Sequence, residues 1–256
     1  MPVRKKRSSK AAEVGVNSLT IKQRKQRKPI KSDILRNIEP YTDNQQLLFD
    51  EYDAGQSIVA YGCAGTGKTF ITLYKALEEV LNEDTPYEKI YLVRSLVATR
   101  EIGFLPGTHD DKADIYQIPY KNMVKYMLSV PQGMDHEMLY GNLKAQETIK
   151  FWSTSFLRGT TLDNAIIIVD EFQNLNGHEL DSIITRVGKD SKIHFCGDAT
   201  QTDLIKASEK TGIMDFLDVL ERMQSVSKIE FDLNDIVRSG IVKEYLVAKH
   251  EAGIIL

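Results

Sequence analysis

The sequence has few of the features that mark extracellular or membrane proteins. Of its 256 residues only two are cysteines, Cys63 and Cys196, which excludes a framework of disulfides and is typical of a reducing compartment. The longest apolar run, Ala165–Val169, has five residues, whereas a membrane-spanning helix needs roughly 18. The N-terminus has no apolar segment of the kind found in signal peptides. We therefore expect a cytoplasmic protein that does not bind membranes.

Charge is divided unevenly along the chain. Residues 1–31 contain eleven lysines and arginines and one acid, Glu13, whereas the remaining 225 residues contain 22 basic and 35 acidic side chains. The N-terminal segment has little apolar surface to bury, so we expect a flexible basic arm. Such an arm can bind the phosphates of RNA or DNA by charge alone. A solubilising or processed tail explains the same charge pattern equally well.

Residues 32–256 have the pattern of a single α/β domain. Short apolar runs alternate with longer amphipathic stretches, as expected for parallel strands joined by helices that cover both faces of a sheet. The predicted strands are Ser57–Tyr61, Ile90–Arg94, Ala165–Val169, Ile193–Cys196 and Lys228–Phe231. The predicted helices are Asn44–Tyr52, Lys68–Leu81, Ile115–Leu128, His136–Leu143, Gly177–Val187, Gly212–Met223 and Ile241–His250.

A phosphate-binding loop follows the first predicted strand. The segment GCAGTGKT matches the pattern G-x-x-x-x-G-K-[ST], with a β-rich run before it and a helical pattern after it. In such a loop successive backbone N–H groups face one anion, and the following helix directs its positive end at the phosphates. Lys68 can reach the β- and γ-oxygens, and Thr69 offers a hydroxyl to Mg²⁺. The residues expected to bind ATP are Gly62, Cys63, Ala64, Gly65, Thr66, Gly67, Lys68 and Thr69.

Two later strand ends carry polar side chains. Asp170 and Glu171 follow the apolar run Ala165–Val169, and a carboxylate at a neighbouring strand end is what a phosphate-binding loop needs to hold Mg²⁺. We expect Asp170 to hold the metal through a water molecule, with Thr69 as the other protein ligand, and Glu171 to activate the attacking water. Gln201, in the GDATQ segment, either senses the γ-phosphate or belongs to a loop closed by an Asx turn.

These motifs together resemble the PhoH family of P-loop ATPases. The matching segments are Tyr61–Phe70, Phe156–Asn174, Gly197–Leu204, Asp235–Val242 and the GFLPG turn Gly103–Gly107. Their order and spacing are similar to those of the family over about four-fifths of the chain. The family is similar to the first motor domain of superfamily 1 helicases, so the resemblance implies a RecA-like ATPase core. In overall length the chain also resembles small phage-encoded members.

The resemblance implies roles for four further residues. Gln45 resembles the glutamine that reads the adenine edge, Gln201 the helicase-type γ-phosphate sensor, and Arg238 the arginine that contacts the γ-phosphate. Arg94 lies where helicase-like proteins have a strand end that faces nucleic acid. Here Ser95 replaces the proline that usually follows this arginine.

The function expected from the sequence is Mg²⁺-dependent hydrolysis of ATP, with Lys68, Glu171, Gln201 and Arg238 as catalytic residues. The helicase-like motif order and the basic arm favour coupling to single-stranded RNA or DNA. Helicases of this kind usually close two motor domains around ATP, whereas this chain has length for one, so we expect a homo-oligomer such as a hexameric ring. A slow ATP-dependent switch or scaffold is the main alternative. A small-molecule kinase is a weaker one, because the sequence has no acceptor-binding motif.

Overall fold

A single parallel sheet forms the centre of the protein. The computed structural model describes residues 32–95, 109–130, 135–153, 159–198 and 207–252. The six strands lie in the order β3-β2-β4-β5-β1-β6, and every pairing between them is parallel. They are β1 (Ser57–Gly62), β2 (Lys89–Arg94), β3 (Ile149–Ser153), β4 (Ala165–Asp170), β5 (Lys192–Gly197) and β6 (Val226–Phe231).

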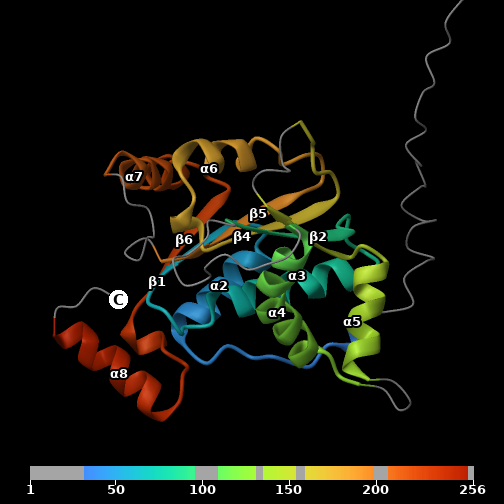
Figure 1. Cartoon of the computed structure of the whole chain (residues 1–256), viewed down its shortest axis with the longest axis horizontal. Helices are drawn as coiled ribbons and strands as arrows, with labels where there is room; N and C mark the ends of the chain where they lie inside the picture. The colour runs from blue at the N-terminus through green and yellow to red at the C-terminus, as the bar shows by residue number, and fades with distance from the viewer. Residues whose placement is uncertain (1–31, 96–108, 131–134, 154–158, 199–206, 253–256) are drawn as a thin grey trace, which may run out of the picture.

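Helices cover both faces of the sheet (Figure 1). On one face lie α2 (Asp43–Asp53), α3 (Lys68–Leu81), α4 (His109–Met127) and α5 (His136–Ala145). On the other lie α6 (Gly177–Ile184) and α7 (Ala207–Glu221), while α8 (Gly240–Glu251) lies to one side of the sheet. The described residues also form the short 3-10 helices η1 (Ser32–Ile34), η3 (Phe172–Asn174) and η4 (Leu233–Asp235). None of the helices in these described ranges is both long and apolar enough to cross a bilayer.

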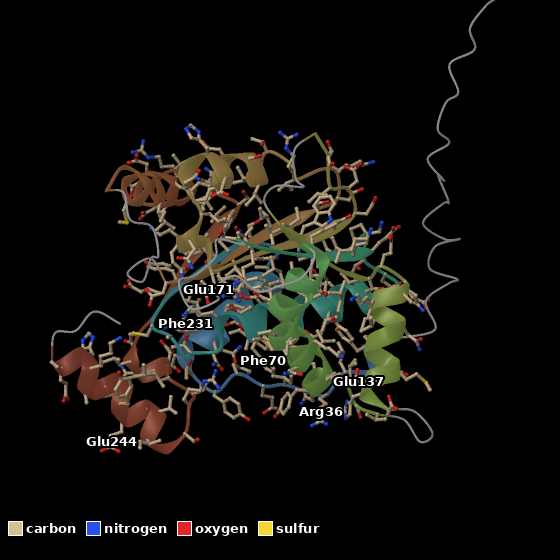
Figure 2. All side chains as sticks on the ribbon, viewed as in Figure 1. Arg36, Phe70, Glu137, Glu171, Phe231 and Glu244 are labelled. Atoms are coloured by element: carbon tan, nitrogen blue, oxygen red, sulfur yellow. The ribbon has the colours of Figure 1, made fainter. Side chains whose placement is uncertain are left out.

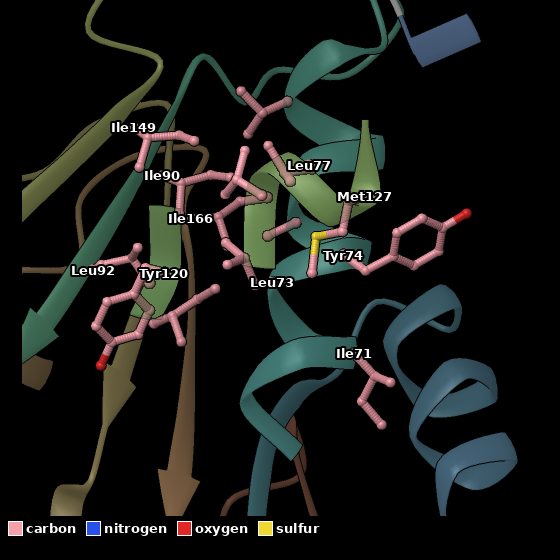
Figure 3. Close-up of a cluster of buried hydrophobic side chains, with 14 of the residues drawn as sticks. Ile71, Leu73, Tyr74, Leu77, Ile90, Leu92, Tyr120, Met127, Ile149 and Ile166 are labelled. Atoms are coloured by element: carbon pink, nitrogen blue, oxygen red, sulfur yellow. The ribbon is translucent and has the colours of Figure 1, made fainter. Parts of the chain in front are cut away.

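The sheet separates two apolar clusters. Alternate residues of a strand point to opposite faces, so Ile166 and Ile168 of β4 pack in the cluster beneath α2–α5, and Ile167 and Val169 pack beneath α6 and α7. Figure 3 shows part of the first cluster, between α3 and the strands. All six residues of β4 are buried. A run of apolar residues without alternation is what a strand covered on both faces requires.

The predicted fold class is confirmed, and all five predicted strands are present. The sequence pattern does not predict β3, a short strand at the edge of the sheet. The pattern also places the start of α4 at Ile115, whereas the helix begins at His109. The predicted basic arm, residues 1–31, lies outside the described residues.

The strand order brings the functional segments to one edge of the sheet. The phosphate-binding loop follows β1, and Asp170 ends β4, with β5 between these two strands. Across the β2–β4 pairing Arg94 is the partner of Asp170, and across β4–β5 Asp170 is the partner of Cys196. Parallel sheets bind ligands outside the carboxyl ends of their strands. The fold is that of a RecA-like P-loop protein, with its site at this edge.

Candidate functional site

The phosphate-binding loop leaves β1 through a glycine that no other residue can replace without strain. Gly62 has a φ of 109°, and a Cβ at this position would collide with the backbone oxygen of Phe231. The same oxygen accepts a hydrogen bond from the Cys63 N–H, 2.8 Å away. The loop is therefore fixed against β6 where it begins, and it ends at Gly67, directly before Lys68 starts α3.

Lys68 lies inside the curl of this loop. Its Nζ donates hydrogen bonds to the backbone oxygens of Gly62, at 2.8 Å, and Cys63, at 2.6 Å. The side chain is largely buried, and burial lowers the pKa of Lys68 although the nearby carboxylate of Asp198 opposes the shift. The loop thus holds its ammonium group at the N-terminus of α3, where the helix dipole also favours anions.

Thr69 and Asp170 form the pair that a divalent metal requires. The Thr69 hydroxyl donates to Asp170 Oδ1 across 2.7 Å, which joins the first turn of α3 to the end of β4. Hydroxyl and carboxylate oxygens are the ligands that Mg²⁺ prefers, and two such protein ligands beside a triphosphate are its usual complement. The residues present therefore fit the predicted metal.

The second oxygen of Asp170 is held by a residue that the sequence pattern does not indicate. Tyr120, on α4, donates its hydroxyl to Asp170 Oδ2 at 2.5 Å, and the positive charge of Arg94 lies near the same hydroxyl. Burial, followed by the negative charge of Asp170, raises the pKa of Tyr120 well above its ordinary value. The hydroxyl therefore keeps its proton and remains a donor to the carboxylate.

Glu171 has the environment of a proton acceptor. Burial, followed by the neighbouring charge of Asp170, raises the pKa of its carboxyl group, and a raised pKa improves a carboxylate as a general base. Its backbone is left-handed, with φ of 52° and ψ of 44°, a conformation that costs a non-glycine residue about 1–3 kcal/mol. Such strain is most often found at functional sites.

Gln173 fixes Glu171 against the end of β5. Its Nε2 donates to Glu171 Oε2 at 2.5 Å, and its Oε1 accepts the Asp198 N–H at 3.0 Å. A Cβ on Gly197 would collide with Gln173 Oε1 and with the Phe172 ring. The absence of a side chain at Gly197 thus makes room for this amide. In the sequence, Gln173 is indicated only by its position two residues after Glu171, the expected general base.

Gln45 joins the start of α2 to the phosphate-binding loop. Its Nε2 donates to the Thr66 backbone oxygen and its Oε1 accepts the Tyr41 N–H, each at 2.8 Å. Gln45 is buried and also lines a pocket beside the phosphate-binding loop. The amide thus supports the loop, and its predicted reading of the adenine edge stays a prediction.

Arg238 packs directly on the phosphate-binding loop. A Cβ placed on Gly65 would lie 3.0 Å from Arg238 Cγ, and the Val237 N–H donates to the Gly65 backbone oxygen at 3.2 Å. The segment that leads into α8 is therefore anchored to the loop, although it follows it in the chain by more than 170 residues.

One pocket of about 970 Å³ is lined by nearly all of these side chains. It contains the expected phosphate ligands from Ala64 to Thr69. Gly62 and Cys63 instead contribute the carbonyls that hold Lys68. Figure 2 shows Glu171 near the centre of the molecule. The remaining predicted site residues in the lining are Gln45, Asp170, Glu171 and Arg238. The predicted sensor Gln201 and the GFLPG turn lie outside the described residues.

The comparison with family models decides the classification. The model described as "PhoH: PhoH-like protein" matches residues 37–249. The chain belongs to the PhoH family. It is 33% identical to a PhoH-like protein of Mycobacterium leprae over 225 residues, 86% of this chain and 62% of that one. It is 34% identical to one of Bacillus subtilis over 192 residues (75% and 57%). It is 30% identical to Protein PhoH of Escherichia coli over 197 residues (77% and 53%).

This PhoH-family chain spans about three-fifths of the relatives' length, or somewhat less. Among solved structures, it is similar to the large terminase of a thermophilic bacteriophage in complex with ADP, with 13% identity and a TM-score of 0.49 over 82% of this chain and 50% of that one. It is similar to Bacteroides Pif1 bound to ssDNA, with 13% identity and a TM-score of 0.38 over 86% and 48%.

Proposed function

We propose that this PhoH-family chain binds ATP with Mg²⁺ and hydrolyses it. The observation that carries the proposal is the convergence of Lys68, the Thr69–Asp170 pair and Glu171 on one pocket. Phosphoryl transfer to water requires positioning and charge neutralisation more than covalent chemistry. A cation, an oxygen pair for a metal and a buried carboxylate beside the phosphate-binding loop supply those requirements.

Each group has a separate task in the proposed reaction. Backbone N–H groups of the phosphate-binding loop bind the phosphates, and Lys68 and Arg238 offset the charge that grows on the γ-phosphate. Thr69 and Asp170 would hold Mg²⁺, which neutralises charge on the β- and γ-oxygens when bound. Glu171 orients water and accepts its proton, while Gln173 keeps the carboxylate in place.

Two substitutions test this division of tasks. Lys68→Ala is expected to abolish turnover, whereas Glu171→Gln is expected to bind ATP and to hydrolyse it about 10²–10⁴-fold more slowly, the usual contribution of a general base. Steady-state hydrolysis and equilibrium binding of ATP measure the two effects. Lys189→Ala is the matched control, because that side chain is 85% exposed. A Glu171→Gln variant with the wild-type rate would rule out Glu171 as the base.

We further propose that hydrolysis is coupled to single-stranded RNA or DNA. Support comes from the helicase-like order of the sequence motifs and from the basic residues 1–31. Single-stranded RNA is expected to stimulate the ATPase, less at high salt, because phosphate contacts weaken as counterions are restored. A chain without residues 1–31 is expected to lose the salt-sensitive part of this stimulation. No stimulation by RNA or DNA at either salt concentration would favour a slow nucleotide-dependent switch.

A further inference from the structure

Among the described residues, Tyr120 makes a hydrogen bond to the carboxylate of Asp170 that the proposed reaction does not use. We propose that Tyr120 is a positioning residue, which fixes the carboxylate of Asp170 for Mg²⁺. This inference rests on the proposed function, because it assigns Asp170 to the metal. Tyr120 acts through Asp170 and touches neither nucleotide nor water in the proposed reaction.

Each carboxylate oxygen of Asp170 accepts a hydrogen bond from a different residue. Thr69 donates to Oδ1 at 2.7 Å and Tyr120 donates to Oδ2 at 2.5 Å. With both oxygens bound, the carboxylate plane cannot rotate, so Oδ1 stays directed at the hydroxyl that completes the metal pair. Asp170 lines the pocket, whereas Tyr120 and Arg94 do not. Tyr120 therefore contacts Oδ2 from the side of Asp170 that faces away from the pocket.

Tyr120 has little freedom to leave this contact. Only 2% of its surface is exposed, and its ring packs against Phe151 of β3 with centroids 5.6 Å apart. Figure 3 shows the ring beside Leu92, with the hydroxyl directed out of the apolar cluster. The positive charge of Arg94 lies near the hydroxyl and acts to lower the pKa of Tyr120. A nearby cation strengthens the donation of the phenol proton to the carboxylate.

The consequence is a metal site that is arranged before the metal binds. Residues that hydrogen-bond to metal ligands typically change metal affinity by about 10–100-fold when they are removed. Tyr120→Phe deletes only the hydroxyl and keeps the packed ring. It is expected to raise the Mg²⁺ concentration that half-saturates nucleotide binding by about the same factor. Binding of ADP in the presence of EDTA is expected to change less than twofold.

A second buried tyrosine provides a matched control. Tyr52 is 1% exposed and donates its hydroxyl to Glu79 Oε2 at 2.9 Å, the same kind of bond. Glu79 is eleven residues after Lys68 in α3, about 16 Å along the helix from the site. Tyr52→Phe therefore loses a buried tyrosine–carboxylate bond without touching Asp170.

The experiment titrates Mg²⁺ against binding of a fluorescent ADP analogue to the wild type, Tyr120→Phe and Tyr52→Phe, with thermal unfolding recorded without nucleotide. We expect the shift in Mg²⁺ dependence in Tyr120→Phe alone. A wild-type Mg²⁺ dependence in Tyr120→Phe would overturn the positioning role while leaving the proposed function intact. A wild type whose ADP binding does not depend on Mg²⁺ would overturn both.

Discussion

At the scale of single residues, Gly197 leaves the space that the side-chain amide of Gln173 occupies beside Glu171. Gly197→Ala is expected to displace Gln173, whose Oε1 occupies the position of the new methyl group. Turnover should fall because Glu171 loses its hydrogen-bonding partner, while the fold is retained. The rate constant for ATP hydrolysis and the unfolding midpoint measure the two effects.

A second glycine provides the control for this substitution. Gly141, in α5, has no atom within 4 Å of a Cβ placed on it. Gly141→Ala is expected to leave turnover unchanged and to stabilise the fold by roughly 0.5–1 kcal/mol, because alanine favours the helix. If Gly197→Ala hydrolyses ATP as fast as Gly141→Ala does, the support that Gln173 gives to Glu171 is not needed for turnover.

The buried His194 gives the stability of the protein a dependence on pH. Its ring stacks on Tyr52, with centroids 4.7 Å apart, and its Nδ1 accepts the Ile58 N–H at 3.1 Å. Burial, with a smaller contribution from Lys192, lowers the pKa of His194 from 6.5 to about 3. Between these values the unfolded chain binds a proton that the folded chain does not. The contribution of His194 to stability is therefore complete above pH 6.5 and is lost progressively as the pH falls toward 3.

Chemical unfolding at several pH values tests this contribution. A single such histidine changes the free energy of unfolding by up to about 1.4 kcal/mol per pH unit. His194→Gln keeps an acceptor for Ile58 but does not titrate, so its free energy of unfolding should fall less steeply below pH 6.5. His250→Gln, at an exposed position in α8, should keep the wild-type slope. If the free energy of unfolding fell equally steeply with pH in the wild type, His194→Gln and His250→Gln, this pH dependence could not be assigned to His194.

At the scale of elements, α8 is the helix most weakly attached to the fold. None of its residues is buried, whereas ten of the fourteen residues of α3 are. Figure 2 shows Glu244 on its outer side, away from Glu171. Its inner side faces the phosphate-binding loop, where Leu246 Cδ1 would lie 3.6 Å from a Cβ on Gly65.

Amide hydrogen exchange is expected to distinguish these two helices. Local stability follows buried contacts, so amides of α8 should exchange faster than those of α3. Arg238 and Lys243 line the pocket from this segment, and binding of ATP with Mg²⁺ should therefore slow exchange in α8. Mass spectrometry of peptides from both helices makes the measurement. Equal protection of α3 and α8, or no response of α8 to nucleotide, would contradict this view of the segment.

The elements that the sequence predicts well are those whose pattern has one interpretation. The apolar run of β4 and the glycine-rich loop between β1 and α3 are examples. The edge strand β3 is short and contains Lys150, so its pattern does not distinguish it from a loop. The early start of α4 is not indicated by the sequence, because residues 109–114 are mostly charged or polar and lack the apolar spacing typical of a helix.

Local motifs predict which residues meet in the pocket, but they do not predict the residues that support them. Lys68, Thr69, Asp170 and Glu171 each belong to a short recognisable segment, and all four line the pocket. Tyr120 is 50 residues from Asp170 in the chain, and nothing in its surroundings in the sequence indicates that contact. Contacts of this kind follow from the packing of α4 on the sheet.

At the scale of the whole molecule, one sheet edge gathers segments from β1, β4 and β5 and from the approach to α8. We propose that a second copy of the chain completes this edge in a homo-oligomer, since helicase-like ATPases usually enclose ATP between two motor domains. The specific ATPase activity is then expected to fall on dilution, as subunits separate. Activity that stays proportional to protein concentration over a wide dilution range would contradict assembly as a requirement.

The most direct test of the central claim is an experimental structure of the chain with Mg²⁺ and a non-hydrolysable ATP analogue. The proposed function predicts the β- and γ-phosphates within the curl of the phosphate-binding loop beside Lys68, and the metal between Thr69 and Asp170. A triphosphate bound elsewhere, or a metal that contacts neither Thr69 nor Asp170 directly or through water, would contradict it.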